Sequence, residues 1–279
     1  MKKLVKRDFK KVIPLFAEFK DQVVIGSVIE GNTPGVIYVD DIDDPKSALL
    51  WNRMDALVLG GAEDNIKFNE ELNNLLKNEL IPDAMERYIP VFTIYYPENS
   101  WENKLDIILD GLDPEKVVRK CFRMNQLKYN WRENIPSDFT IQPISKEFLN
   151  KTGLENKNSV IGWIMSFWPS LEIFTEKGVG FCLHNDDIIV SWCLSVFVSG
   201  NQFEFGLETD KRYRNRGFAK LVASACLEYC CEHNLEPHWH CSAQNRPSAL
   251  VAESIGFEED FAYSVHSINL VKLKERYNR

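Results

Sequence analysis

The segment from residue 203 to 221 constrains the fold of this chain more than any other stretch. Its first half alternates apolar and polar residues and predicts a strand that carries Phe203, Phe205, Leu207 and Thr209 on one face. A short basic connection follows, and apolar residues then recur at helical spacing from Phe218, so a helix is expected to open at Gly217. Such a helix start leaves unpaired backbone N–H groups at the positive end of the helix dipole, which predicts an anion-binding site.

The basic connection opposes the charge of the whole chain. Five of the ten residues from Lys211 to Lys220 are Lys or Arg, whereas the formal net charge is -8. A bound phosphate explains this local excess of positive charge. A solvated basic turn that ends in a glycine is the alternative, and the segment alone does not decide between them.

The next fifty residues add further features in order. An apolar and aromatic strand is expected over residues 237–241, and Asn245-Arg-Pro-Ser248 then opens a helix that ends at Gly256-Phe257. The spacing Arg214-x-x-Gly217-x-Ala219 resembles the acetyl-CoA pyrophosphate signature of the GNAT N-acetyltransferases. The strand, the asparagine and the helix closed by Gly-Phe are similar to the end of the GNAT domain. Together these features favour the phosphate.

The resemblance covers roughly residues 138–270, and its specific motifs lie within residues 204–257. The pattern of the first half predicts an N-terminal α/β domain, and the resemblance implies that a GNAT fold with a mixed, mainly antiparallel sheet flanked by helices follows it, in an α+β protein of the α/β type. We expect a partner domain at 1–130, which could be a degenerate GNAT-like domain, a linker at 131–137 and the acetyltransferase domain at 138–279. This arrangement resembles a two-part bacterial branch of the GNAT superfamily.

Composition limits the class of protein. A length of 279 residues with 44% hydrophobic content supports one large or two ordinary domains and excludes a disordered chain or a small disulfide scaffold. Seven cysteines at scattered positions predict reduced thiols. No apolar run suits a signal peptide or membrane span, so a cytoplasmic protein is expected, with no membrane partner. The sequence pI of about 5.3 argues against a nucleic-acid partner. A monomer or homodimer is expected.

The first half contains two segments that invite other interpretations. The acidic loop Asp40-Asp-Ile-Asp-Asp-Pro45 lacks the glycine and closing glutamate of an EF-hand loop, so it predicts a solvated turn. Gly60-Gly61 precedes a helical pattern without a nucleotide-binding motif and predicts a strand-to-helix turn. A helix is also expected from Pro114 to Cys121, because Pro-Glu suits a first helical turn.

The resemblance implies a set of residues that bind acetyl-CoA as a co-substrate. Backbone groups of Leu207, Glu208 and Thr209 would pair with the pantetheine arm. Asn245 and Ser248 would lie beside the arm and near the sulfur. Backbone amides and positive side chains of the basic loop would hold the pyrophosphate, at Arg214, Asn215, Arg216, Gly217, Phe218, Ala219 and Lys220.

Acetyl transfer to a small amine would also need groups that move protons. Glu204 and Glu208 share one face of their strand, and either could act as general base, although a surface carboxylate is the alternative for each. His240 is a further candidate. Two histidines, His238 and His240, without a third ligand make a poor metal site, so no metal is expected.

One departure from the family pattern bears on turnover. Many GNAT enzymes carry a tyrosine four residues before the final Gly-Phe to protonate the leaving thiolate, and this chain has Ala252 there. Ser248, Tyr263 or water could substitute. The sequence therefore supports two functions, an N-acetyltransferase for a small amine and a non-catalytic acyl-CoA-binding sensor. Aromatic residues could line a substrate cleft between the two halves, or pack in the core, at Trp163, Phe167 and Trp168.

Overall fold

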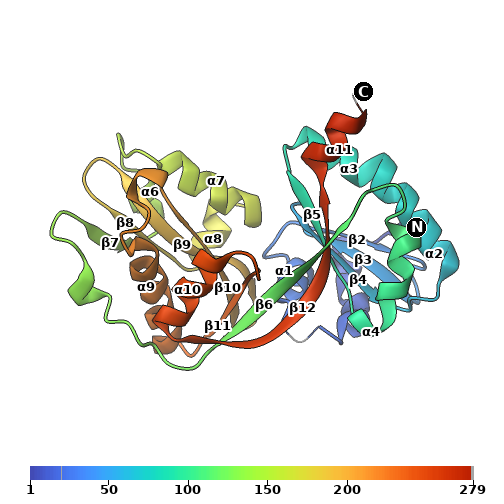
Figure 1. Cartoon of the computed structure of the whole chain (residues 1–279), viewed down its shortest axis with the longest axis horizontal. Helices are drawn as coiled ribbons and strands as arrows, with labels where there is room; N and C mark the ends of the chain where they lie inside the picture. Colours follow the sequence, from blue (N-terminus) through green and yellow to red (C-terminus); the bar gives the residue numbers. More distant parts are fainter. Residues whose placement is uncertain (20, 278–279) are drawn as a thin grey trace. The chain divides into compact units, whose positions relative to one another are not determined.

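The computed structural model describes residues 1–19 and 21–277 (Figure 1). The chain divides into two compact units, residues 1–119 with 263–279 and residues 120–262. The sequence-based division placed a linker at 131–137 and gave the whole C-terminus to the second domain. In the structure the boundaries fall inside two long strands, β6 (Glu115–Met124) and β12 (Phe257–Asn269), each of which begins in one unit and ends in the other.

The first unit contains a mixed sheet in the order β1-β2-β3-β4-β5-β12. Neighbours from β1 to β4 are antiparallel, β4 and β5 are parallel, and the end of β12 is antiparallel to β5. These strands are β1 (Lys2–Lys3), β2 (Val36–Val39), β3 (Ser47–Trp51), β4 (Ala56–Gly61) and β5 (Val91–Tyr95).

Helical segments cover this sheet. The segments after β4 bury a large apolar cluster against β3, β4 and β5, and η1 packs on β3 and β4. They are η1 (Lys6–Phe16), α1 (Val23–Glu30), α2 (Ile66–Leu75), η2 (Leu76–Leu80), α3 (Ile81–Glu86), α4 (Glu98–Trp101), η3 (Glu102–Lys104), α5 (Leu105–Ile108) and α11 (Leu270–Tyr277).

The second unit has the sheet order β6-β11-β10-β9-β8-β7. Neighbours from β7 to β10 are antiparallel, whereas β10 and β11 are parallel. These strands are β7 (Thr140–Pro143), β8 (Gly180–His184), β9 (Ile189–Ser199), β10 (Gln202–Thr209) and β11 (Glu236–Ser242).

Helices cover both faces of the second sheet (Figure 1). Trp192 of β9 contacts Trp163 of α7, whereas the next residue, Cys193, accepts a bond through its carbonyl from Cys226 of α9. The helical segments are η4 (Arg132–Asn134), α6 (Lys146–Leu149), α7 (Lys157–Phe167), α8 (Leu171–Lys177), η5 (Lys211–Tyr213), α9 (Phe218–Glu232) and α10 (Arg246–Ile255).

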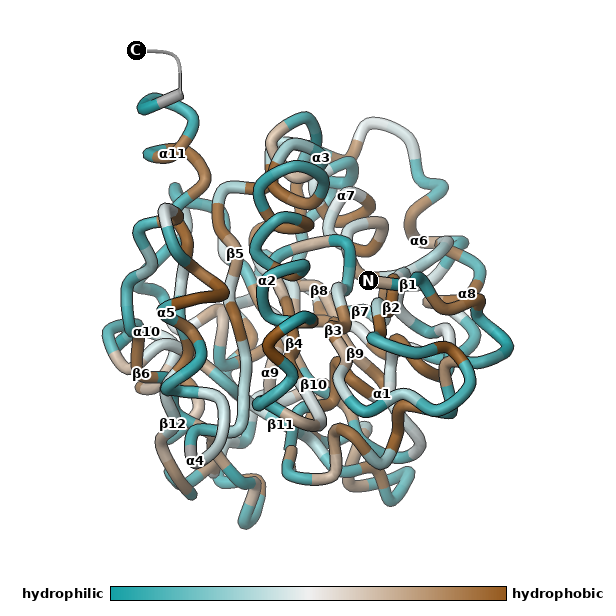
Figure 2. Tube along the Cα trace, turned by 90° about the vertical axis from the view of Figure 1, so that its right-hand side faces the viewer, coloured by the Kyte–Doolittle hydropathy of each residue, from teal (hydrophilic) through white to brown (hydrophobic). Residues whose placement is uncertain are grey.

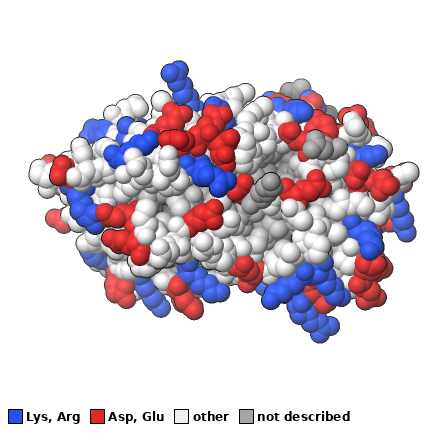
Figure 3. Space-filling view, turned by 90° about the horizontal axis from the view of Figure 1, so that it is seen from below, with Lys and Arg blue, Asp and Glu red and all other residues white. Residues whose placement is uncertain are grey.

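Hydrophobic residues are concentrated in the strands of both sheets. Every residue of β3 is buried, and so is β9 from Ile189 to Val198, and Figure 2 shows β3, β4 and β9 in the hydrophobic colours. On the face in Figure 3, Lys and Arg side chains lie interspersed with Asp and Glu. Within the described residues, no helix combines the length and apolar character needed to cross a membrane. All seven cysteines are free, and only Cys231 is exposed.

The predicted helix over residues 114–121 is wrong, because residues 115–124 form strand β6. The Pro-Glu pair gave a helix-start signal, but the following residues include Val117 and Val118, whose branched side chains favour a strand. Cys121 and Phe122 are buried in the second unit, so tertiary packing decides the conformation.

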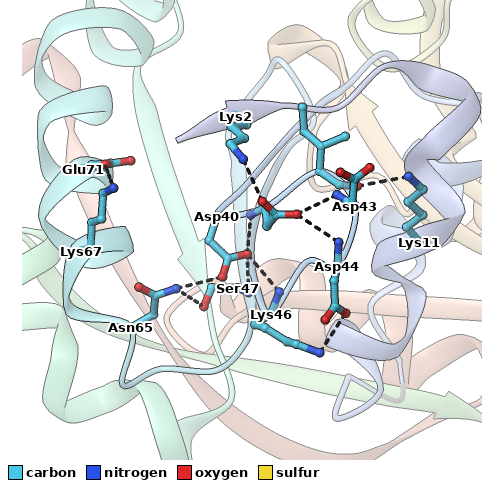
Figure 4. A network of polar contacts seen from close by, with 12 residues as sticks. Lys2, Lys11, Asp40, Asp43, Asp44, Lys46, Ser47, Asn65, Lys67 and Glu71 are labelled. Carbon is cyan, nitrogen blue, oxygen red and sulfur yellow. Dashed lines mark hydrogen bonds and ion pairs between the residues drawn. The ribbon is translucent and has the colours of Figure 1, made fainter.

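The acidic loop between β2 and β3 is a turn in which the carboxylates of Asp40, Asp41 and Asp44 accept hydrogen bonds from the chain itself (Figure 4). Asp40 accepts from the backbone N–H groups of Lys46 and Ser47 and from the Asn65 side-chain amide. The hydrogen bond from Lys2 and the backbone donors of the turn lower the pKa of Asp41 to about 2. Among the described residues, no group of three or more His, Cys, Asp or Glu side chains could hold a metal ion.

Candidate active site

Strands β10 and β11 separate after a short paired stretch. Their parallel ladder joins Gln202 to Glu236, Phe203 to Pro237 and Glu204 to His238, whereas β10 continues to Thr209 and β11 to Ser242. On its other side β10 stays paired with β9 as far as Thr209. The edge of β10 that faces β11 beyond Glu204 is therefore outside the described ladder, where its backbone groups can pair with an extended ligand.

A bulge in β9 lies beside this point. Glu204 pairs with Phe197 and Phe205 pairs with Ser195, so Val196 is the extra residue. A bulge of this kind bends the strand and increases its local twist, and bulges are common next to active sites. The bulge and the end of the β10–β11 ladder coincide at Glu204.

The start of α9 is open. Gly217 precedes the helix with φ 79° and ψ 3°, in the left-handed region, and no side chain caps the helix. A Cβ placed on Gly217 would meet no atom within 4 Å. Phe218 is buried against Phe139, with ring centroids 5.2 Å apart, and this contact fixes the helix start. The start of α9 therefore has no side-chain cap and has open space beside Gly217, as an anion site requires.

Two of the basic side chains hold the loop in place. Arg212 donates to Asp210 and Glu155, and Asp210 also accepts from Asn156 at 2.8 Å. The hydrogen bond from Arg212 lowers the pKa of Asp210 well below its usual range. Arg214 donates through Nε to the carbonyl of Thr209 at 3.1 Å and through Nη2 to Glu208 at 2.8 Å. These contacts anchor the loop to the end of β10.

The other three basic side chains of the loop have no ion pair within the described residues. These are Lys211, Arg216 and Lys220. Arg216 lies over the ring of Tyr213, 5.3 Å from its centroid. An open hollow of about 490 Å³ adjoins this loop and is lined by Glu208, Thr209, Asp210, Lys211, Arg212 and Arg214. Of the predicted phosphate-binding side chains, Arg216 and Lys220 are thus available to an anion, whereas Arg214 is engaged by Glu208.

The candidate bases lie on two strands. Glu204 and Glu208 are both partly exposed and share a face of β10. Glu208 accepts from Arg214 and from the backbone N–H of Thr209 through Oε1, which leaves Oε2 without a partner among the described residues. His240 lies on β11, with its Nε2 3.7 Å from the thiol sulfur of Cys121.

The start of α10 follows the predicted pattern in part. The Asn245 side chain caps the helix by accepting from the backbone N–H of Ser248. The Ser248 hydroxyl accepts from the indole N–H of Trp239 at 3.1 Å, so its own proton stays available for donation. Ala252 is fully buried.

Sequence reasoning missed the residues that anchor the basic loop. Asn156 has φ 65° and bonds both Asp210 and the carbonyl of Ile189. Asp210 caps the short helix η5 by accepting from the backbone N–H of Arg212. The signal available for Asp210 was its position directly before a helical turn, where Asp is a preferred cap. No local signal marked Asn156, which lies fifty-four residues earlier in the chain.

A splayed parallel strand pair beside an open helix start defines an acyl-CoA transferase fold of the GNAT type, and comparison with known proteins agrees. The model of the GNAT acetyltransferase family matches residues 13–266. The chain therefore belongs to the GNAT acetyltransferase family, which confirms the predicted family and fold class. It is an acyltransferase, and members of this family use acetyl-CoA as co-substrate and transfer to an acceptor.

Individual relatives cover both units. The chain is 23% identical over 266 residues to an uncharacterized N-acetyltransferase of Bacillus subtilis, YdfB, covering 95% of this chain and 98% of the relative. A GCN5-related N-acetyltransferase-like protein from Streptococcus suis shares the fold with a TM-score of 0.68 at 20% identity, over 94% of this chain and 98% of that one. A tandem GNAT protein from the clavulanic acid biosynthesis pathway has a TM-score of 0.59 at 10% identity, over 96% and 97%.

Proposed function

We propose that this protein transfers the acetyl group of acetyl-CoA to the amine of a small molecule by direct attack on the thioester. The observation that carries the proposal is the open start of α9, at Gly217, beside the separated strands β10 and β11. Backbone N–H groups of residues 214–219 would bind the pyrophosphate, with charge added by Arg216 and Lys220.

The pantetheine arm would lie along the free edge of β10. Leu207 and Glu208 are beyond the last pair of the β10–β11 ladder, so their backbone groups can bond the amides of the arm, whereas the N–H and carbonyl of Thr209 already bond Glu208 and Arg214. Asn245 and Ser248, at the start of α10, would flank the arm on the β11 side. The thioester would then lie in the gap between the two strands.

The amine would need to lose a proton before or during attack. An alkylamine with a pKa of about 10.4 is neutral in roughly one molecule in 2,500 at pH 7, a cost of about 4.6 kcal/mol. Glu208 is the preferred base, because Arg214 holds one carboxylate oxygen and leaves the other to accept the proton. Glu204 and His240 are the alternatives.

In the reaction the amine nitrogen bonds to the carbonyl carbon, and the tetrahedral intermediate then releases CoA as the C–S bond breaks. The base takes the proton of the amine, and the thiolate takes a proton from an acid. Ser248 suits the role of this acid, because its hydroxyl oxygen accepts a hydrogen bond from Trp239 and its own proton is left to donate.

A second function is favoured by one observation. Ala252 is fully buried at the position where many family members carry the acidic tyrosine, so this chain has no side-chain acid there. A protein that binds acyl-CoA without efficient turnover would need none. The alternative is therefore a non-catalytic acyl-CoA sensor.

Release of free CoA thiol from acetyl-CoA, measured against a panel of amines, tests the proposal. The enzyme should release thiol at a rate that depends on the amine, with an N-acetylated product of matching amount. If calorimetry shows that CoA binds but no amine in the panel causes thiol release from acetyl-CoA, the sensor function is favoured over the enzyme. Absence of CoA binding would contradict both functions.

A further inference from the structure

Helix α7, together with Trp168 directly after it, carries two apolar stripes, and only one of them is needed for the core. Val160, Ile164 and Trp168 recur every four residues and are fully or almost fully buried. Trp168 also donates its indole N–H to the carbonyl of Ser195 at 2.8 Å, so its role is structural. Trp163 and Phe167 form the second stripe, one turn apart, and stay partly exposed.

Trp163 of the second stripe rests directly on β10. A Cβ on Gly206 would lie 3.0 Å from Cζ3 of Trp163 and 2.7 Å from Cγ1 of Val196, so glycine allows the indole to reach the strand backbone. Gly206 lies between Glu204 and Glu208 on the same face of β10. The indole therefore covers the stretch of strand that bears both candidate bases.

Two residues of β9 complete this surface, which we name the aromatic shelf: Trp163, Phe167, Trp192 and Phe197. The ring of Trp163 meets Trp192 at 6.1 Å and 87°, and Phe167 meets Phe197 at 5.7 Å and 89°. Trp192 and Phe197 are five residues apart and would point to opposite faces of a regular strand. The bulge at Val196 returns them to one face, because Trp192 pairs with Glu208 and Phe197 pairs with Glu204.

The shelf contains an unsatisfied donor. The indole Nε1 of Trp192 is buried and has no hydrogen-bond partner among the described residues. A buried N–H without a conventional acceptor is costly, and the face of a neighbouring aromatic ring can serve as a weak acceptor. The shelf thus places apolar rings beside two carboxylates on one side of the sheet.

On the basis of the proposed function, we infer that the acceptor is a primary amine carried on a flat aromatic body, an arylalkylamine. Its ammonium group is drawn to the carboxylates of Glu204 and Glu208, and its ring packs on Trp163 and Phe167. This arrangement places the amine beside the separated strands, where the thioester would lie. Small polar amines and amino sugars gain less, since the exposed stripe of α7 presents rings to them.

The test compares 2-phenylethylamine with ethanolamine and glucosamine as acceptors for the full-length protein. The value of kcat/KM for 2-phenylethylamine should exceed the others by at least about tenfold, the effect of burying one ring. Trp163→Ala should raise KM for 2-phenylethylamine by about tenfold, and Trp163→Phe should restore most of the affinity. The matched control is Met165→Ala on the exposed side of the same helix, which should change neither value.

Binding is measured separately from turnover. Calorimetric titration of 2-phenylethylamine into the CoA-bound protein should give heat that Trp163→Ala removes and Met165→Ala keeps. Two results would overturn the inference that the acceptor is an arylalkylamine and leave the proposed acetyl transfer intact. One is an equal or higher kcat/KM for ethanolamine or glucosamine, and the other is no binding of 2-phenylethylamine to a protein that binds CoA. If the unmodified protein does not bind CoA at all, in contrast, the proposed function itself is contradicted.

Discussion

The two units share one arrangement of strands, but they differ at the helix start that follows a central strand. In the first unit α2 follows β4, whose next neighbour β5 is parallel, and in the second α9 follows β10, whose next neighbour β11 is parallel. Each unit thus presents a helix start beside a parallel strand pair.

The start of α2 is closed by the chain itself. Asn65 caps the helix by accepting from the backbone N–H of Phe68 at 3.1 Å, and its amide donates to Asp40 at 3.0 Å (Figure 4). A Cβ on Gly61 would lie 2.1 Å from the carbonyl oxygen of Lys46, so the backbone is packed there. The connection contains Glu63 and Asp64, whose charge repels anions.

The start of α9 has the opposite properties. Gly217 has open space around it, the helix has no side-chain cap, and the connection is basic. Strand β10 also carries Glu204 and Glu208, whereas β4 is apolar and almost wholly buried. Both units therefore contain a helix start with its dipole. The cap, the acidic charge and the close packing at α2 exclude an anion there, and only the start of α9 is left for a ligand.

The largest expected effect concerns the carboxylates that β4 lacks. Glu208→Gln should lower kcat by about 10²- to 10⁴-fold, because the amide cannot take the proton of the amine, and should flatten the acidic limb of the pH profile. Steady-state thiol release measures both quantities. Glu204→Gln is the matched control on the same strand face and should have a smaller effect. Unchanged kinetics for Glu208→Gln would remove this residue as the base.

The next effect tests the open helix start. Gly217→Val should weaken CoA binding by about 100-fold, or about 2.8 kcal/mol, because the side chain occupies the phosphate position and strains the backbone. Gly153→Val is the matched control, since Gly153 has φ 78° in the same unit and equally open surroundings. Both variants should lose similar stability in urea, and only the first should lose CoA binding by calorimetry. Equal CoA affinity for the two would contradict the phosphate site.

A smaller effect is expected from the anchor of the basic loop. Asp210→Asn should weaken CoA binding by about tenfold, because Arg212 loses its ionised partner and the loop is held less firmly. Calorimetry at pH 7 measures the change. Glu155→Gln, which removes the more exposed partner of Arg212, should have less effect, and the reverse order would contradict this role for Asp210.

The lowered pKa of Asp210 also sets the sign of the pH dependence. Since the folded-state pKa lies below the unfolded value of about 3.9, the anchor is fully present above that value and is lost as pH falls through the folded pKa. Asp210 therefore stays ionised between about pH 5 and 8, and its contribution to CoA affinity should not change with pH in that range.

The smallest effect lies in the first unit. Asn65→Ala should reduce the free energy of unfolding by about 1 kcal/mol through the lost cap of α2, with no change in CoA affinity. Urea denaturation and calorimetry on the same samples measure the two quantities. A fall in CoA affinity of the size seen for Gly217→Val would mean that both helix starts serve the ligand.

The local elements of the second unit were predictable because their signals are short-range. Alternation predicted β10, and the glycine with its apolar repeat predicted α9. The helix predicted over residues 114–121 failed because β6 is stabilised by contacts with distant strands, which no local pattern records. The return of β12 to the first unit was missed for the same reason.

The site was predictable where it depends on backbone conformation and not where it depends on side-chain partners. Gly217 was found from spacing alone, since its conformation is required by the turn. The ion pair between Arg214 and Glu208 and the contact of Trp163 with Gly206 arise from folding, and neither has a sequence signal. Trp168, one of the predicted cleft residues, is part of the core.

The backbone amide spectrum during a CoA titration tests the central comparison most directly. Large shifts are expected for the amides of residues 216–219 at the start of α9, and none for residues 65–68 at the start of α2. Shifts confined to residues 65–68, or saturation by CoA with residues 216–219 unmoved, would contradict this expectation.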